Sequence, residues 1–192
     1  MIEKRRHPRI RFATQPRVRI GQFGVFGHGD LENLSLGGLM LRTRLPLKLN
    51  EVCGCEFAVL NSPLIDVSAV IVSKVGGDLY GARFQPGPVS ELLIHDVIVR
   101  ALASGYGSVL SINDLQGRKV MRITGGLNLG LRGDFMHHLT RSGVVDLDLA
   151  EVTGIDHDGF NLCRIAIDKY KVRVVRSSPS VRAVLGEYLG EP

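Results

Sequence analysis

The chain has 192 residues, of which 44% are apolar, and a formal net charge of +5 at pH 7. This length accommodates one large domain or two small ones. No apolar run approaches the ~20 residues of a transmembrane helix, and the basic start is not followed by the apolar segment of a secretory signal, so the composition argues against membrane insertion and export and predicts a cytoplasmic protein.

The first feature along the chain is a basic segment, Lys4-Arg5-Arg6-His7-Pro8-Arg9-Ile10-Arg11. No helical or strand period runs through it, and Pro8 has no N–H to give to a helix or a sheet, so we expect a mobile, extended arm over residues 1–12. Residues 1–20 carry a net charge of +6, so the rest of the chain sums to −1. Charge confined to one tail fits a local anion site, or a solvated basic tail, better than the broad basic face of a nucleic-acid binder.

Residues 16–42 predict a strand, a glycine-rich hairpin loop and a second strand. The strands are Arg17–Ile20 and Leu39–Thr43, and the loop is expected to hold Gly21, Gly24, Gly27 and Gly29. No Gly-Lys-Ser/Thr follows these glycines, which argues against a phosphate-binding loop.

The segment Asn33-Leu34-Ser35-Leu36-Gly37-Gly38 predicts an exposed turn. Asn and Ser side chains bond nearby backbone groups, and the glycine pair permits positive φ. Such a turn presents an amide, a hydroxyl and open N–H groups, which are the donors and acceptors that a purine edge needs.

The pair Arg5-x-x-x-Arg9 and Asn33-x-Ser35-x-x-Gly38 resembles the two motifs of the PilZ domain, the bacterial receptor module for cyclic di-GMP. The resemblance covers residues 4–103. Segments that match the family's later strands and its helix are Leu45–Leu60, Asp66–Lys74, Tyr80–Phe84 and Val89–Ala103.

The resemblance implies a cyclic di-GMP site formed by Arg5, Arg9, Asn33, Ser35, Gly37 and Gly38. The arginines would clamp phosphates and stack on or bond to guanine, Asn and Ser would read the guanine edge, and the glycines would let the backbone approach the ligand. Lys4, Arg6 and Arg11 would be auxiliary. A basic residue at position 4 favours two bound ligand molecules over one.

Short strands and frequent turns up to Phe84 predict a small antiparallel barrel or sandwich. Ser90 is expected to cap the helix that follows. The cysteines Cys53 and Cys55 alternate along an expected strand and so face one side. Without a CxxC pair or clustered histidines, free thiols are favoured over a metal site, and no cofactor is expected.

We predict two domains, with a PilZ-like barrel and its arm over residues 1–103, a linker over 104–108, and a second domain over 109–192. Strands alternate with helices in this second half, which predicts an open α/β sheet. The expected strands are Lys119–Thr124, Val144–Leu149 and Val172–Val175, and the expected helices are Phe135–Ser142, Phe160–Tyr170 and Pro179–Leu189.

Residues 144–159 combine an apolar strand, a loop with acids and a glycine that opens a helix. This pattern resembles the STAS domain of anti-sigma-factor antagonists, which has Asp-Ser-Ser-Gly before the helix. Gly125–Asn128 stands where that family often has Gly-Glu-Leu-Asp. The resemblance covers about residues 107–190 and implies a protein partner.

A kinase phosphorylates the second serine of that STAS motif, and Asp158 occupies the matching position. A carboxylate is no target for a serine kinase, although it can imitate part of the phosphate charge. A carboxylate there also stabilises the N–H groups and the dipole at a helix N-terminus, and we favour this role. The sequence therefore predicts a constitutive docking surface rather than a kinase-switched one.

Asp146, Asp148, Asp156 and Asp158 are the only dense carboxylates, and the first two could form an acidic patch on one strand face. No nucleophile or partner base accompanies them, and the adjacent His137 and His138 diverge on a helix, so no enzyme is predicted.

We therefore predict a cyclic di-GMP receptor and adaptor in bacterial signalling. Its ligand would order the arm and alter protein–protein output through the STAS-like domain. The main alternative is a scaffold of the same fold that binds no nucleotide and acts only as a protein-interaction module.

Overall fold

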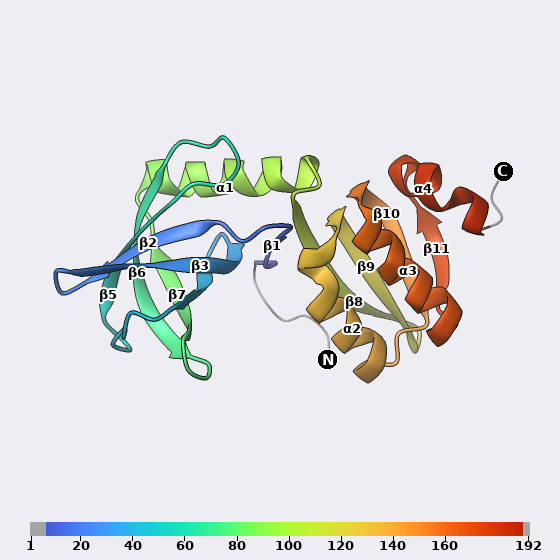
Figure 1. Cartoon of the computed structure of the whole chain (residues 1–192), viewed down its shortest axis with the longest axis horizontal. Helices are drawn as coiled ribbons and strands as arrows, with labels where there is room; N and C mark the ends of the chain where they lie inside the picture. Colours follow the sequence, from blue (N-terminus) through green and yellow to red (C-terminus); the bar gives the residue numbers. More distant parts are fainter. Residues whose placement is uncertain (1–6, 190–192) are drawn as a thin grey trace. The chain divides into compact units, whose positions relative to one another are not determined.

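The computed structural model of the protein describes residues 7–189 (Figure 1). This part of the chain divides into two compact units, His7–Arg100 and residues 101–189, which we call the barrel unit and the α/β unit. The division falls inside helix α1 (Pro88–Ala103). None of the helices in the described range is long and apolar enough to cross a membrane.

Six antiparallel strands of the barrel unit close into a barrel in the order β2-β3-β4-β7-β6-β5 (Figure 1). Burial alternates along β2 and β6, so one side chain in two points into the core, as a two-residue strand period requires. The strands are β2 (Arg17–Gln22), β3 (Val25–Ser35), β4 (Gly38–Thr43), β5 (Val52–Phe57), β6 (Ile65–Lys74) and β7 (Leu79–Gln85), preceded by the short β1 (Arg11–Phe12). The predicted antiparallel barrel is confirmed.

The first hairpin is tighter than we expected. Its turn is Phe23-Gly24, and both residues have positive φ, 53° and 79°. Two such residues match the twist of the flanking strands, so the ladder continues up to the turn. Gly27 and Gly29 therefore lie within β3 and not in a loop.

Helix α1 begins at Pro88, two residues before the cap that we expected. Pro is favoured at a first helical position because its fixed φ suits the helix and its missing N–H is not needed there. The hydroxyl of Ser90 instead donates to the carbonyl of Asp66 in β6, at 2.7 Å. Ser90 thus ties the helix to the barrel and does not cap it.

The α/β unit contains a sheet with the strand order β8-β9-β10-β11. β8 and β9 form an antiparallel hairpin, whereas β9, β10 and β11 run parallel. The elements are β8 (Gly107–Leu115), β9 (Arg118–Leu127), η1 (Leu129–Leu131), α2 (Arg132–Arg141), β10 (Asp146–Ile155), α3 (His157–Tyr170), β11 (Arg173–Ser177) and α4 (Pro179–Leu189). An α/β region after the barrel is confirmed.

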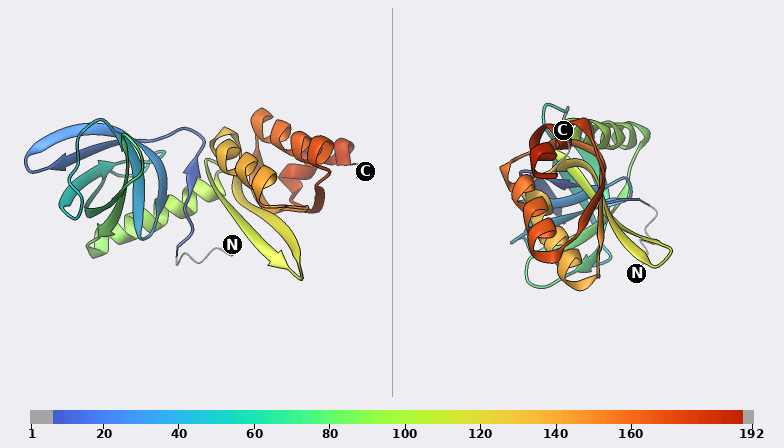
Figure 2. Two further views of the ribbon diagram at one scale, coloured as in Figure 1. Left: turned by 90° about the horizontal axis from the view of Figure 1, so that it is seen from below. Right: turned by 90° about the vertical axis from the view of Figure 1, so that its right-hand side faces the viewer.

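Helices α2 and α3 lie on one side of this sheet (Figure 2). The core between them and the sheet includes Met121, Leu147, Phe135 and Leu162. Helix α4 contributes to the same core, and its Tyr188 ring packs edge-on against Phe160 of α3, with centroids 6.1 Å apart.

The strand β8 was not predicted, and Gly107 and Ser108 of the expected linker belong to it. Its turn to β9 is Gln116-Gly117, again with positive φ at both residues. The Gly117 N–H donates to the Asp114 carboxylate at 2.8 Å. An Asp three residues before a Gly is a turn signal that could have revealed the hairpin.

Candidate functional site

The candidate site lies where the end of the arm runs beside strand β3 and the β3–β4 turn. Ile10 pairs with Leu34 through two backbone hydrogen bonds, of 2.7 Å and 3.0 Å between nitrogen and oxygen. Ile10 and Phe12 are also buried, so this part of the predicted mobile arm over residues 1–12 is held against the barrel. Buried apolar anchors at these two positions explain why the expected mobility does not extend to them.

Two further contacts extend the pairing in both directions. A side chain built at Gly37 would lie 3.4 Å from the ring of His7, so His7 lies over the β3–β4 turn. Arg11 Nη1 donates to the carbonyl of Glu32 at 3.4 Å and lies 3.6 Å from its carboxylate. Arg11, expected to be auxiliary in ligand binding, therefore anchors the arm.

Arg9 lies between His7 and the Ile10 pairing, and it is exposed. The arm thus carries Arg9 past the end of β3, close in sequence to the bonded position and beside the predicted turn. Lys4, Arg5 and Arg6 lie outside the described residues.

The β3–β4 turn differs from the exposed turn that we predicted. The ladder pairs Asn33 with Met40 and Ser35 with Gly38, so only Leu36 and Gly37 remain between the strands. Asn33 and Ser35 are 4% and 8% exposed, because the barrel closes around the ends of these strands. Asn33, Ser35 and Gly38 are therefore held on strands, and only Gly37 of this segment's site residues lies in the turn.

The hydrogen bonds of these two side chains are weak or local. Asn33 Nδ2 points at Met40 Sδ, 3.7 Å away, and a thioether is a poor acceptor. The Ser35 hydroxyl donates to the Gly38 carbonyl at 3.1 Å, which closes the turn. Exchanging such contacts for bonds to a ligand would cost little.

Of the two glycines, Gly38 is required by close packing and not by its φ. Neither Gly37 nor Gly38 has positive φ, contrary to our expectation. A side chain at Gly38 would lie 2.2 Å from the carbonyl oxygen of Ala82 in β7, so only glycine permits this close approach of β4 and β7. The Gly37 carbonyl accepts from the N–H of Phe84, also in β7, at 3.1 Å.

Arg83 is a candidate residue that the sequence reasoning missed. It pairs with Gly38 in the β4–β7 ladder and is exposed. We assigned its segment only as a strand, but its exposure between buried Ala82 and Phe84 follows from strand alternation. It adds a cation beside the β3–β4 turn.

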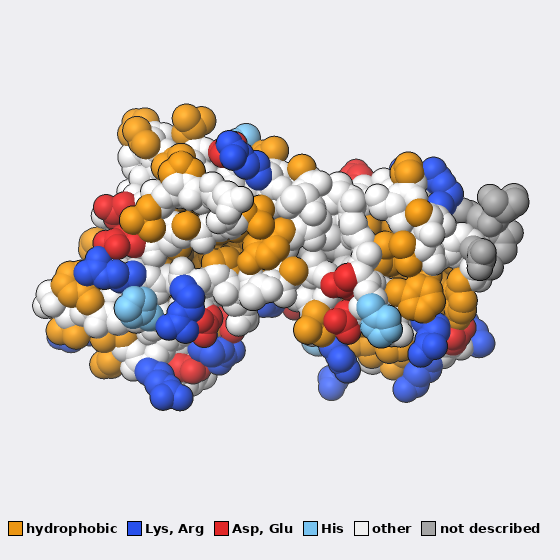
Figure 3. All heavy atoms as spheres, turned by 45° about the horizontal axis from the view of Figure 1, so that its top comes forward, with side chains coloured by type: hydrophobic (Ala, Val, Ile, Leu, Met, Phe, Trp, Pro, Cys, Tyr) orange, Lys and Arg blue, Asp and Glu red, His pale blue; other side chains and the backbone are white. Residues whose placement is uncertain are grey.

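The surface drawn in Figure 3 shows Lys and Arg side chains scattered among acidic and apolar ones, with no continuous basic area on that face. Several barrel arginines are paired, as in Arg19 with Glu56 at 2.7 Å and Arg42 with Glu32 at 2.9 Å. This agrees with a basic charge concentrated in the first residues of the chain.

The cysteines of the barrel face one side of β5, as predicted. Cys53 and Cys55 are buried with their Sγ atoms 3.9 Å apart, and the contact between the two thiols together with burial raises the pKa of Cys55. Burial raises the pKa of Cys163 to about 12. Between residues 7 and 189, no group of three or more His, Cys, Asp or Glu could hold a metal ion.

In the α/β unit, Asp146 and Asp148 do not form the acidic patch that we considered. Both are buried, and arginines from the neighbouring strands cover them. Arg118 donates to Asp146 at 2.8 Å and Arg122 donates to Asp148 at 3.0 Å. Burial alone would raise the pKa of each carboxyl, but the hydrogen bonds from the arginines of both neighbouring strands outweigh it and hold the pKa below its ordinary value.

Asp158 lies in the first turn of α3, but the helix cap is a different residue. Asp156 accepts the bond from the Gly159 N–H at 2.8 Å. Asp158 is half-buried and lines a cavity of about 340 Å³ with residues that include Leu129, Arg132 and Asn161. The Asp158 carboxylate still interacts favourably with the helix dipole from the first turn, while Asp156 makes the direct cap hydrogen bond.

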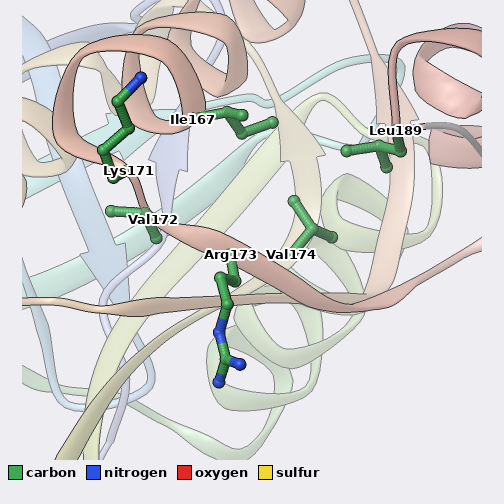
Figure 4. A pocket seen from close by; sticks show the side chains of 6 residues that line it. All are labelled: Ile167, Lys171, Val172, Arg173, Val174 and Leu189. Atoms are coloured by element: carbon green, nitrogen blue, oxygen red, sulfur yellow. The ribbon is translucent and has the colours of Figure 1, made fainter.

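A second cavity of about 360 Å³ opens beside β11 (Figure 4). Its walls are mainly apolar, and the guanidinium of Arg173 points away from Ile167 and Leu189. Arg173 is bonded to Asp146 instead, at 3.2 Å. This cavity therefore brings no convergent polar groups together.

The fold and the site together define a closed antiparallel β-barrel domain with an N-terminal arm paired beside its β3–β4 turn. Residues 3–104 match the family model described as PilZ domain, which is more than half of the chain. The protein belongs to the PilZ domain family.

The solved structures to which this chain is similar include the PilZ domain of CeSA from a cellulose-synthesizing bacterium, with 19% identity, a TM-score of 0.40, and coverage of 47% of this chain and 95% of that one. The Bacillus subtilis inhibitor of motility has 17% identity, a TM-score of 0.44 and 53% coverage of both chains. The PilZ domain of YcgR from Escherichia coli, solved with c-di-GMP, has 18% identity, a TM-score of 0.44, and coverage of 51% and 91%. No curated protein matched the chain.

Proposed function

We propose that the barrel unit is a receptor for cyclic di-GMP and that the α/β unit passes the signal to a protein partner. The observation that carries this proposal is the pairing of Ile10 with Leu34. It joins the arm that contains the first motif to the strand that contains the second. Arg9 of the first motif thereby lies beside the strand that holds Asn33 and Ser35, 24 residues or more further along the chain.

The chemistry of the two motifs complements the ligand. Cyclic di-GMP carries two phosphates and two flat purines, and an arginine fork bonds phosphate oxygens and stacks on purines. Arg5 and Arg9 would supply these contacts. Asn33 and Ser35 would read the guanine edge with groups whose present partners are weak or local. Gly37 and Gly38 keep the turn narrow, so backbone can approach the ligand.

The remaining cations would assist. Arg83 is exposed next to the turn, and Lys4 and Arg6 flank the first motif. A basic residue at position 4 favours two ligand molecules in the site. Micromolar affinity corresponds to about −8 kcal/mol, which a few charge-assisted bonds at ~1.5–3 kcal/mol each would supply after the cost of ordering the arm.

Ligand binding would act by fixing the arm. Because backbone hydrogen bonds to Leu34 hold Ile10 against the barrel, the change would be confined to the residues before it, including Arg5 and Arg9. A ligand shifts such an equilibrium only by its greater affinity for the ordered state, so the same arginines would control both binding and signalling. The role is that of a non-enzymatic, cytoplasmic receptor.

The α/β unit would be a STAS-like output domain. Its β10–α3 segment supports this assignment, because a buried strand leads through Asp156 directly into a helix, as the resemblance requires. Asp158 at the position of the STAS phospho-acceptor would make this output constitutive with respect to kinases. A barrel that binds no nucleotide and serves only as a scaffold is the competing function.

Calorimetric titration with cyclic di-GMP tests the proposal. We expect micromolar or tighter binding by the wild type and a loss of about 100-fold in Arg5→Ala/Arg9→Ala, since two charge-assisted bonds at ~1.5 kcal/mol each are removed. The matched control is Arg17→Ala/Arg19→Ala, which removes the same charge from exposed ion pairs on β2. It should bind within about twofold of the wild type.

The stoichiometry of the same titration decides between one ligand and two. Limited proteolysis supplies the second readout, because ligand should protect residues 1–9 from cleavage. A wild type that binds no cyclic di-GMP would move the function to the scaffold alternative. Equal losses in both double variants would reduce the arm to a non-specific basic tail.

A further inference from the structure

The sheet of the α/β unit has one face that its helices α2 and α3 do not cover (Figure 2). On this face two rows of charged side chains cross the three parallel strands. Each row has a buried aspartate of β10 in the centre and an arginine of β9 and of β11 on either side. The rows are Arg118–Asp146–Arg173 and Arg122–Asp148–Arg176.

The two kinds of charge differ in how far solvent reaches them. The side chains of Asp146 and Asp148 are 4% and 3% exposed, whereas those of the four arginines are 41–67% exposed. Four guanidinium groups share two carboxylates. The two rows therefore present positive charge outward over buried negative charge. One exposed acid, Glu151 of β10, shares the face beyond the second row, where it accepts a bond from Thr124 at 2.7 Å.

The arginines also retain donors that the aspartates do not use. A guanidinium has five N–H groups. Arg122 gives only its Nε–H to Asp148, at 3.0 Å, and Arg118 gives its Nε–H and one Nη2 group to Asp146. The buried carboxylates thus fix the guanidinium groups in place and leave donors free for a ligand, which lowers the entropy cost of binding.

We propose that this face is a docking surface for an extended, acidic segment of a protein partner. The inference deepens the output role of the α/β unit and rests on that part of the proposed function, but not on the nucleotide site. Along a strand, positions 118 and 122 are about 13 Å apart. Carboxylates four residues apart in an extended segment have the same separation, so such a segment can meet both rows.

Nucleic acid fits the face less well. Single strands bind to aromatic platforms, and none of the side chains that β8–β11 present on this face is aromatic. Apart from the acidic Glu151, their other members are small or aliphatic, such as Ser111 and Val120. The chain beyond residue 20 also has no net positive charge to extend a duplex footprint.

The test uses the full chain and a fluorescently labelled peptide of alternating Glu and Ser, with anisotropy as the readout. The variant is Arg173→Gln/Arg176→Gln, which removes the β11 guanidinium group from each row. Each aspartate keeps its β9 arginine, so neither carboxylate is left unpaired. The matched control is Arg132→Gln/Arg164→Gln, which removes the same charge from two exposed arginines of α2 and α3.

We expect the wild type to bind the peptide at low salt, the β11 variant to bind about tenfold more weakly, and the control to stay within about twofold. Thermal melting of each variant verifies that the unit remains folded. A peptide of alternating Gln and Ser should not bind. Absent wild-type binding, or equal losses in both variants, would overturn the proposal, as would tighter binding of an oligonucleotide of equal charge.

Calorimetry with cyclic di-GMP on the same proteins separates this inference from the nucleotide site. Both variants should keep wild-type nucleotide affinity. A protein that binds the acidic peptide but no cyclic di-GMP would refute the receptor proposal and leave the docking surface standing.

Discussion

The two units treat their buried polar side chains in opposite ways. In the barrel unit, Asn33 and Ser35 are buried with a thioether and a turn carbonyl as their partners. In the α/β unit, Asp146 and Asp148 are buried under two arginines each. Polar groups with weak hydrogen-bond partners can exchange these partners for a ligand. Buried carboxylates that are fully paired instead hold the neighbouring arginine side chains in position.

The largest predicted effect comes from removing the arginines that pair with a buried aspartate of the α/β unit. Replacing Arg122 and Arg176 with Ala leaves the Asp148 carboxylate buried without either arginine. We expect the free energy of unfolding of the α/β unit to fall by about 3–5 kcal/mol, the usual cost of an unpaired buried charge. Denaturant titration followed by circular dichroism measures it, and Arg132→Ala/Arg164→Ala should change it by less than about 0.5 kcal/mol.

The pH dependence identifies the carboxylate as the cause. In the wild type the pKa of Asp148 lies below its ordinary value of 3.8, so its contribution is present above that pH and lost as pH falls further. Without the two arginines, the effect of burial, which raises the pKa, is opposed mainly by the hydrogen bond from the Ala150 N–H at 3.2 Å, so the carboxyl takes up its proton at a higher pH than in the wild type. The stability gap between wild type and variant should therefore narrow below pH ~4, and a gap that is independent of pH would contradict the assignment.

The next effect concerns how the barrel holds its site. Gly38→Ala places a methyl group against the carbonyl of Ala82, so β4 and β7 must separate, and we expect a loss of about 1–3 kcal/mol in barrel stability. Gly54→Ala is the control, because nothing lies within 4 Å of a side chain built there. If both substitutions are neutral, the close approach at the β3–β4 turn is not a constraint on the site.

The sequence predicted those parts of the fold and site that depend on local residue types. The arm, the Asn33–Gly38 segment and the barrel followed from motifs, turn residues and strand alternation. The sequence could not show that Asn33 and Ser35 are buried, because that depends on where β4 and β7 close the barrel. The expected exposed turn is in fact the end of a ladder.

The acidic patch that the sequence left open does not form, for a related reason. Asp146 and Asp148 stand close together in the sequence, but Arg118 and Arg122 are 28 and 26 residues away from them. Only the parallel pairing of β9 with β10 makes these residues neighbours. Charge patterns along a chain therefore indicate little about a sheet face until the strand order is known.

The smallest predicted effect concerns an exposed ion pair, which serves as the reference for the buried ion pairs of the α/β unit. Asp96 and Arg100 form an i,i+4 ion pair on α1 at 2.9 Å, with side chains 38% and 64% exposed. Water screens both groups, so a double-mutant cycle with Asp96→Ala and Arg100→Ala should give a coupling of only about 0.3–0.5 kcal/mol. If this coupling is as large as the free energy of unfolding lost in Arg122→Ala/Arg176→Ala, burial of the carboxylate does not explain the strength of the ion pairs on the sheet. A small coupling on α1, together with a large stability loss in Arg122→Ala/Arg176→Ala, would show that an aspartate–arginine pair contributes to stability mainly when the aspartate is buried.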